Sequence, residues 1–191
     1  MLTEDQADVI QFLAAPATHH TAAVERIDTH SAIVFLAGER AYKLKRAVRF
    51  DYLDFSTVER RRAMCHAEVC LNRRTAPGLY RGAVPVTREP GGALALRGSG
   101  PAIDWVVEMQ RFPQEALLDR LAATGRLDLE LMEPLAADIA AFHRIAEPRP
   151  DHGGSPGMAW VIDGNAAGFA EYGGTVLDAA ACRRSAVEKS R

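Results

Sequence analysis

Two lysines in one short segment and a glutamate further along the chain have the residue types and spacing needed to grip a phosphate. In "AYKLK", residues 41–45, strand geometry would place Ala41, Lys43 and Lys45 on one face. A strand lysine offers a point positive charge to phosphate oxygens, and a glutamate on the following helix, Glu68, would hold that lysine in place and keep it charged. The alternative interpretation is a pair of edge-strand lysines and an exposed helix glutamate, because both residue types are common on protein surfaces.

Strand-like segments before and around these lysines must position them. The segments alternate or run apolar, and a tight turn at Gly38-Glu39-Arg40 joins the second to the third. They comprise "VERIDTH" (24–30), "AIVFLA" (32–37) and "AYKLKRAV" (41–48). A helix over residues 3–14 is predicted before them, because Thr3 and Gln6 have the spacing of a capping box.

The glutamate belongs to a segment, residues 54–78, with strong helix signals. Ser56 is the predicted N-cap, and Glu59 completes a Ser-x-x-Glu capping box. Pro77-Gly78 ends the pattern. The apolar spacing predicts a buried stripe that Glu68 flanks, formed by Met64, Ala67 and Leu71.

Strands and helices are segregated in the remainder of the chain. Three more strands are predicted at 82–88, 93–98 and 104–112, then helices at 114–123 and 128–146, a loop at 148–157, and one short segment and one helix up to Arg191. This segregation predicts an α+β fold with an antiparallel sheet, since long apolar strands do not alternate with helices as a parallel sheet requires.

Composition excludes some classes of function. The 191 residues are 48% hydrophobic and 25% charged, with a net charge of -2, so no global field draws the chain to nucleic acid or to a membrane surface. The longest apolar runs are too short to span a bilayer, and the acidic start does not resemble a signal peptide. Three cysteines in a chain of this length favour reduced thiols and a cytoplasmic location.

Several long runs of the sequence resemble one family. Residues 34–87, 104–112 ("DWVVEMQRF"), 140–147 ("AAFHRIAE") and 152–169 ("HGGSPGMAWVIDGNAAGF") are similar to aminoglycoside phosphotransferase-like kinases, and most similar to the N-terminal domain of bifunctional aminoglycoside phosphotransferase/ATP-binding proteins. The resemblance implies a protein-kinase-like fold. Residues 1–112 would form the antiparallel-sheet N-lobe with one packed helix and an N-terminal helix, and residues 113–191 the incomplete beginning of a helical C-lobe.

The resemblance also implies roles for individual residues. A strand lysine of such kinases contacts the phosphates of ATP and pairs with a helix glutamate, here Glu68. The spacing Ala-x-Lys selects Lys43, whereas the form Tyr-x-Leu-Lys selects Lys45, and the sequence leaves this choice open. The hinge that holds adenine through its backbone would comprise Glu108, Met109, Gln110 and Arg111.

The catalytic half of the family pattern does not occur in these residues. No loop of the form His-Gly-Asp-x-His-x-x-Asn is found, so no catalytic residue and no metal ligand is expected in this chain, and the Mg²⁺ ligands are expected beyond Arg191. No Walker A motif occurs either, and a P-loop ATPase domain is expected as a C-terminal partner in a longer protein. We therefore expect the N-terminal part of an ATP-dependent phosphotransferase that acts on a hydroxyl of an unknown small molecule and is inactive by itself. The alternatives are a non-catalytic nucleotide-binding or regulatory module and an interaction domain without a nucleotide.

Overall fold

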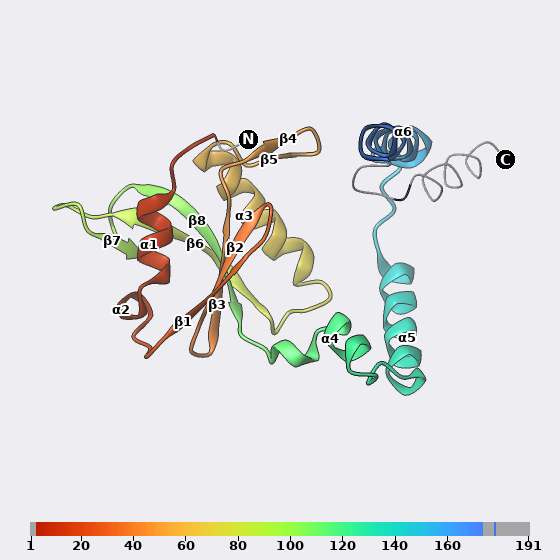
Figure 1. The fold of residues 1–191 in the computed structure, drawn as a ribbon, viewed down its shortest axis with the longest axis horizontal. Coiled ribbons are helices and arrows are strands. Elements are labelled where there is room, and N and C mark those ends of the chain that lie inside the picture. The colour runs from red at the N-terminus through yellow and green to blue at the C-terminus, as the bar shows by residue number, and fades with distance from the viewer. Residues whose placement is uncertain (1–2, 174–177, 179–191) are drawn as a thin grey trace. The chain divides into compact units, whose positions relative to one another are not determined.

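The computed structural model describes residues 3–173 and 178, and the chain divides into two compact units, Met1–Leu135 and Ala136–Arg191. The first unit contains the whole β-sheet, and Figure 1 shows this sheet between two helices, α1 and α3. The sequence predicted a division at residues 112 and 113, which falls two residues after the last strand. As a domain boundary it stays a prediction.

A six-stranded antiparallel sheet forms the centre of the first unit, in the strand order β1-β2-β3-β8-β6-β7. Its strands are β1 (Val24–Asp28), β2 (Ala32–Ala37), β3 (Arg40–Lys45), β6 (Tyr80–Arg88), β7 (Leu94–Leu96) and β8 (Ala102–Gln110). All six were predicted within a few residues, and the α+β class with an antiparallel sheet is confirmed. Strand β3 pairs with β2 on one side and with β8 on the other, although α3, β6 and β7 lie between β3 and β8 in the sequence.

The turn between β2 and β3 fixes which residues share a face. Gly38 adopts a positive φ of 54°, a conformation that glycine reaches without a Cβ clash, and it closes the hairpin so that Val34 lies opposite Lys43. Tyr42 and Leu44 therefore join the buried apolar core on one side of the sheet, whereas Lys43 and Lys45 face the other side. The predicted arrangement of the two lysines on one face is confirmed.

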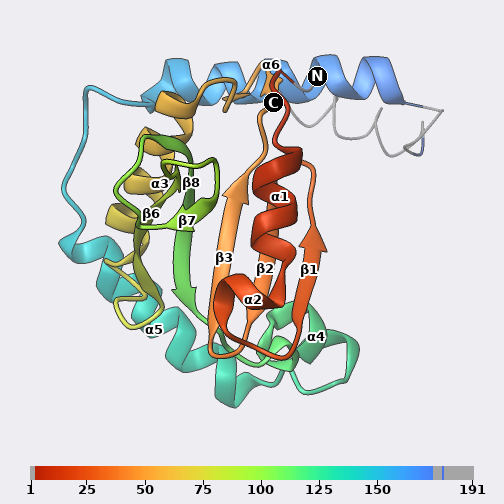
Figure 2. The same cartoon turned by 90° about the vertical axis from the view of Figure 1, so that its left-hand side faces the viewer.

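Helix α1 (Ala7–Ala14) lies over the part of the sheet formed by β1, β2 and β3, as Figure 2 shows. Its Val9 and Leu13 belong to the apolar core on that face. The predicted start at residue 3 was wrong, because α1 begins four residues later and its N-cap residue, Gln6, makes no side-chain cap. Thr3 instead donates its hydroxyl to the carbonyl of Ala47 at 3.0 Å. Gln6 likewise bonds to residues far away in the sequence, Lys45 and Asp104. The spacing of Thr3 and Gln6 in the sequence could not show these tertiary partners.

Helix α3 (Val58–Asn72) covers the opposite face of the sheet. Its N-cap is Thr57, whose hydroxyl accepts a hydrogen bond from the amide of Arg60 at 3.3 Å, and not the predicted Ser56. The predicted buried stripe was also wrong, since the side chains of Met64 and Leu71 are exposed. The residues that turn toward the sheet are Arg61, Cys65, Glu68 and Val69. Two of these are charged, so a search for apolar periodicity selected a different face.

A buried polar cluster bridges β3 and β8 where their ladder ends. Gln6 donates its side-chain amide to the carbonyl of Lys45 at 3.0 Å and to the carboxylate of Asp104 at 2.7 Å. It also accepts a hydrogen bond from the amide of Ala47 at 2.7 Å. The guanidinium of Arg61 donates to the other oxygen of Asp104 at 2.8 Å, and both side chains are only 1% exposed. These bonds satisfy groups that would otherwise be buried without a partner.

The remaining elements include one hairpin and several helices. They are α2 (Pro16–His19), β4 (Arg49–Phe50), β5 (Leu53–Asp54), the 3₁₀ helix η1 (Gln114–Ala116), α4 (Leu118–Ala123), α5 (Leu129–Ile145) and α6 (Gly154–Tyr172). The helix predicted at 128–146 is confirmed as α5, whereas the one predicted at 114–123 is divided into η1 and α4 by Leu117, whose backbone is extended. The loop predicted at 148–157 was wrong in its second half, because α6 begins at Gly154 and its first turn accommodates Pro156. The sequence predicted one short segment and one helix between this loop and Arg191, and residues 174–177 and 179–191 of that range lie outside the described residues.

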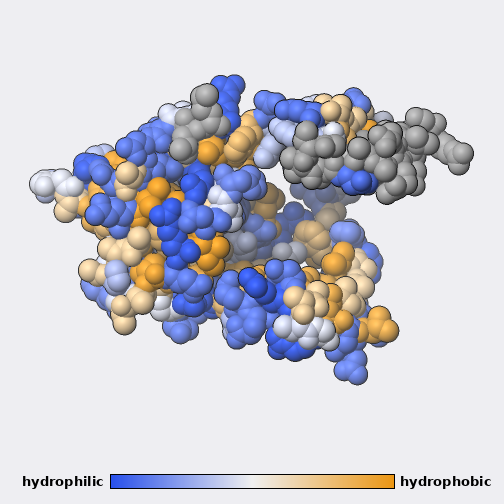
Figure 3. All heavy atoms as spheres, viewed as in Figure 1, coloured by the Kyte–Doolittle hydropathy of each residue, from blue (hydrophilic) through white to orange (hydrophobic). Residues whose placement is uncertain are grey.

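Helices α5 and α6 expose apolar side chains, and Figure 3 shows such side chains at the surface. Leu129, Ile145 and Trp160 are 76%, 83% and 62% exposed. No helix within residues 3–173 has the length and apolar character that crossing a bilayer requires.

Candidate functional site

The two lysines of β3 converge on a single glutamate of α3. Lys43 Nζ lies 2.9 Å from Glu68 Oε1, and Lys45 Nζ lies 2.6 Å from Glu68 Oε2, so each ammonium group takes a different oxygen of one carboxylate. Two positive charges and one negative charge give this cluster a net charge of +1. The structure thus brings together all three residues that sequence spacing singled out.

The two lysines differ in their access to solvent. The side chain of Lys45 is 6% exposed and that of Glu68 is 13% exposed, whereas that of Lys43 is 32% exposed. Lys45 Nζ also lies 4.8 Å from the centre of the Phe55 ring, a distance at which a cation is attracted to the ring face. Lys43 is therefore the ammonium group that an anion in solution can reach.

Burial and charge act in opposite directions on the groups around Glu68. Burial alone would raise the pKa of Glu68, but hydrogen bonds from Lys45 and Lys43 outweigh it and lower the pKa below its usual range. Burial raises the pKa of the Cys65 thiol to about 12, and it also raises the pKa of Tyr80. Glu68 is thus held as a carboxylate among neighbours that stay protonated near neutral pH.

An apolar pocket of about 220 Å³ adjoins Ala41, two residues before Lys43 on the same strand face. Its lining also includes the end of β8 and the segment that follows it, and comprises Ile27, Val34, Leu36, Ala41, Met109, Gln110, Arg111, Phe112 and Gln114. This volume is below the roughly 300–1,000 Å³ of pockets that enclose drug-sized ligands. The pocket would therefore enclose only a small apolar group, with any charged part of a ligand outside it.

The four predicted hinge residues have different environments. The carboxylate of Glu108 lies on the face opposite Lys43 and forms ion pairs with Arg40, at 3.4 Å, and with Arg97. Met109 packs beside Cys65 and Val69 and also lines the apolar pocket.

The last two of these residues, Gln110 and Arg111, line the pocket as well. The backbone amide of Gln110 donates to the carbonyl of Leu79 at 2.8 Å, and the backbone amide of Arg111 donates to the carbonyl of Glu39 at 2.9 Å. These two amides are thus already hydrogen-bonded within the protein. An adenine contact at the hinge stays a prediction.

Sequence reasoning missed the part of the pocket that β1 and β2 contribute. Val34 and Leu36 pair with Lys43 and Ala41, so they share the face of these residues, and Ile27 pairs with Val34. The two-residue turn at Gly38-Glu39 carried this information, because it fixes the hairpin register and hence the face of every residue in β2.

Three curated proteins match part of the chain, and each is called an uncharacterized protein. One is from Mycobacterium bovis and two are from Mycobacterium tuberculosis, each 33% identical over 120 residues. The match covers 63% of this chain and 22% of each relative, so the chain spans about a fifth of the length of the proteins it matches. No family model matches the chain, and no solved structure gives a significant match.

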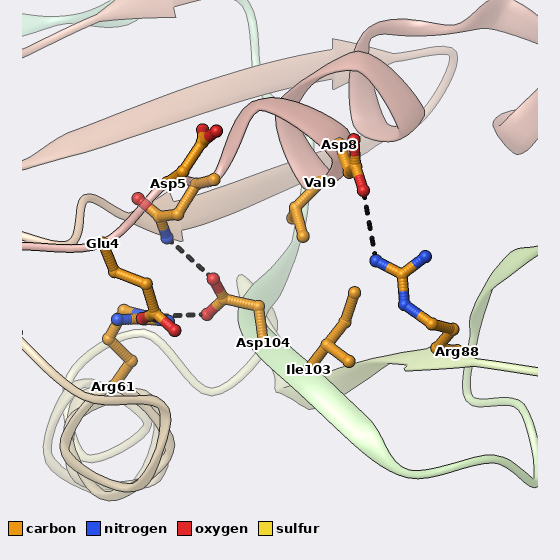
Figure 4. A pocket seen from close by; sticks show the side chains of 9 residues that line it. Glu4, Asp5, Asp8, Val9, Arg61, Arg88, Ile103 and Asp104 are labelled. Carbon is orange, nitrogen blue, oxygen red and sulfur yellow. Dashed lines mark hydrogen bonds and ion pairs between the residues drawn. The ribbon is translucent and has the colours of Figure 1, made fainter. Parts of the chain in front are cut away.

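A polar pocket of about 250 Å³ lies on the other side of the sheet, beside α1 (Figure 4). Most of its charged lining residues are paired with one another: Asp104 with Arg61, Glu4 with Arg61, and Asp8 with Arg88. Asp5, which also lines the pocket, accepts a hydrogen bond from the backbone amide of Ala7. Because its innermost groups complete the bridge between β3 and β8, we assign this pocket a structural role.

Proposed function

We propose that the first unit binds ATP as the nucleotide-binding lobe of a phosphotransferase with a protein-kinase-like fold. The observation that carries the proposal is the placement, on one sheet face, of an apolar pocket beside Ala41 and of the Lys43–Glu68 ion pair. Two further features support it, since α3 lies between β3 and β6 in sequence and β8 lies beside β3 in the sheet. This is the order expected of the lobe that the sequence resembles.

The residues of the site would divide the ligand between them. The pocket lined by Val34, Leu36 and Ala41 would take the adenine ring through apolar contact. Lys43, the more exposed ammonium group, would bind phosphate oxygens, and Glu68 would orient it. This assignment favours Lys43 over Lys45, a choice that the sequence left open.

MgATP, when bound, would supply the phosphoryl group for transfer to a small-molecule hydroxyl. Within residues 3–173 and 178 no three His, Cys, Asp or Glu side chains gather into a metal-binding group, and we assign no Mg²⁺ ligand. The acceptor, a P-loop ATPase domain as partner and a cytoplasmic location belong to the same proposal for the longer protein.

Equilibrium urea unfolding with and without MgATP tests this proposal. A ligand at 100 times its Kd raises the free energy of unfolding by about 2.7 kcal/mol. We expect stabilisation of this kind for the wild-type chain and for Arg120→Met, which removes one exposed positive charge from α4, and no stabilisation for Lys43→Met. Absence of any MgATP effect on the wild-type chain would overturn the proposal and favour an interaction domain without a nucleotide.

A non-catalytic nucleotide-binding module is the second candidate, because the 191 residues contain no His-x-Asp-x-x-x-x-Asn motif. Both candidates predict the same stabilisation by MgATP. Transfer of radiolabelled γ-phosphate to a small molecule by the longer protein would favour the enzyme, whereas nucleotide binding without transfer would favour the module.

A further inference from the structure

Two lysines on one carboxylate raise a question that the proposed function does not answer. A single strand lysine would suffice to contact phosphate, yet both Lys43 and Lys45 reach Glu68, within 2.9 Å and 2.6 Å. The two ammonium groups are not equivalent, because Lys45 is almost completely buried and lies over the ring of Phe55. A ligand in the apolar pocket would meet Lys43 first, since Ala41 and Lys43 are adjacent on the same strand face.

Binding of an anion by Lys43 has a consequence for Glu68. An ammonium group that turns toward phosphate oxygens weakens its bond to Glu68, whose side chain is only 13% exposed. A buried carboxylate that loses its only cation is strongly destabilised and tends to take up a proton. Lys45 prevents this, because it keeps its own bond to the second oxygen of Glu68.

We propose, on the basis of the proposed function, that Lys45 is a positioning residue: a permanent counter-ion of Glu68 that frees Lys43 to bind the phosphates of a nucleotide. The net charge of +1 on the three side chains is then available to the ligand, rather than being cancelled within a single lysine–glutamate pair. The arrangement also fixes α3, because a second buried ion pair, Arg61 with Asp104 at 2.8 Å, holds the same helix to β8. The site is accordingly assembled before the ligand arrives.

The decisive measurement is proton uptake on binding. The titratable groups that face Glu68 are Lys43 and Lys45 from β3, Cys65 from α3 and Tyr80 from β6. Burial keeps the Cys65 thiol and the Tyr80 hydroxyl protonated near neutral pH, so an additional proton taken up on binding would go to the Glu68 carboxylate. In Lys45→Met, therefore, MgATP binding should be coupled to protonation of Glu68, and the affinity should rise by up to tenfold for each unit that the pH falls.

Isothermal titration calorimetry of MgATP, in buffers of different ionisation enthalpy, measures this coupling. Protons that the nucleotide itself takes up or releases contribute equally in all variants. The number of protons taken up by each variant is therefore compared with the number taken up by the wild-type chain. We expect up to one additional proton taken up by Lys45→Met, none by Lys45→Arg, which keeps the positive charge, and none by Lys45→Met combined with Glu68→Gln. At pH 8 the affinity of Lys45→Met should be at least tenfold lower than that of the wild-type chain.

The outcomes separate the two proposals. No MgATP binding by the wild-type chain would contradict the proposed function itself. Binding that Lys43→Met abolishes, but that Lys45→Met leaves unchanged in affinity and in proton uptake, would overturn the positioning role alone.

A measurement on the wild-type chain avoids any dependence on variants that fold poorly. In NMR spectra of the lysine ammonium groups, saturation with MgATP should shift the signal of Lys43 and leave that of Lys45 in place, and the reverse pattern would refute the proposal.

Discussion

Replacement of Glu68 by glutamine should destabilise the chain far more than replacement of either lysine. Glu68→Gln keeps the shape of the side chain but leaves the 6%-exposed ammonium of Lys45 without a carboxylate. Breaking a buried pair in this way costs about 3–5 kcal/mol, and we expect the lower end of this range, about 3 kcal/mol, because the Phe55 ring and the glutamine oxygen still attract the cation.

The two lysine variants should have much smaller effects. Lys43→Met leaves Glu68 bonded to Lys45 and removes an ammonium group that is one-third exposed and therefore screened by water, so the expected cost is about 1 kcal/mol or less. Lys45→Met leaves Glu68 bonded to Lys43 and relieves the desolvation of a buried charge, so its cost should also be about 1 kcal/mol.

Urea unfolding followed by circular dichroism measures these differences, with unchanged m-values as evidence that the cooperative unit is the same. The double variant Lys45→Met with Glu68→Gln should recover most of the stability that Glu68→Gln alone loses, because no buried charge is left unpaired. The reasoning would be refuted if Glu68→Gln and Lys43→Met differed by less than about 0.5 kcal/mol, or if the double variant were less stable than Glu68→Gln.

Two further predictions concern ionisation. Because the pKa of Glu68 is lowered on folding, its ionisation stabilises the folded chain fully above the unfolded pKa of 4.5, and this stabilisation is lost as the pH falls through the folded pKa. Glu68→Gln should therefore flatten the dependence of stability on pH below 4.5. An unchanged slope in this acid range would contradict the assignment. In a Cys182→Ser background, Ellman's reagent at pH 8 should modify the exposed Cys70 and spare Cys65, whose thiol is buried with a pKa of about 12. Two equally fast thiols would refute this assignment.

The sheet of the first unit was largely predictable from sequence because its signals are local. Alternating apolar residues and the Gly38-Glu39 turn determine the strands and the hairpin register, and hence the shared face of Lys43 and Lys45. The existence of the helix around Glu68 was predictable as well, although its cap is Thr57 and not Ser56, and it ends at Asn72, five residues before Pro77.

The orientation of α3 was not predictable from its own residues. Apolar spacing selected Met64 and Leu71, yet the face that contacts the sheet contains Arg61 and Glu68. Charged residues face a sheet only where they can form ion pairs with it. Their partners here are Asp104 and the two lysines, which lie on strands far away in the sequence. The start of α1 was predicted four residues too early for the same reason, because Thr3 and Gln6 bond to groups far away in the sequence.

The sequence by itself therefore determined the strands, the hairpin register and the three charged residues of the candidate site. Only the tertiary structure decided how these residues share their charges. It buried Lys45 against the Phe55 ring, left Lys43 accessible, and formed an apolar pocket beside Ala41 from residues as far apart in the sequence as Ile27 and Gln114. Burial and pairing depend on the neighbours that packing brings together across the sheet, and residue type and local spacing do not contain that information.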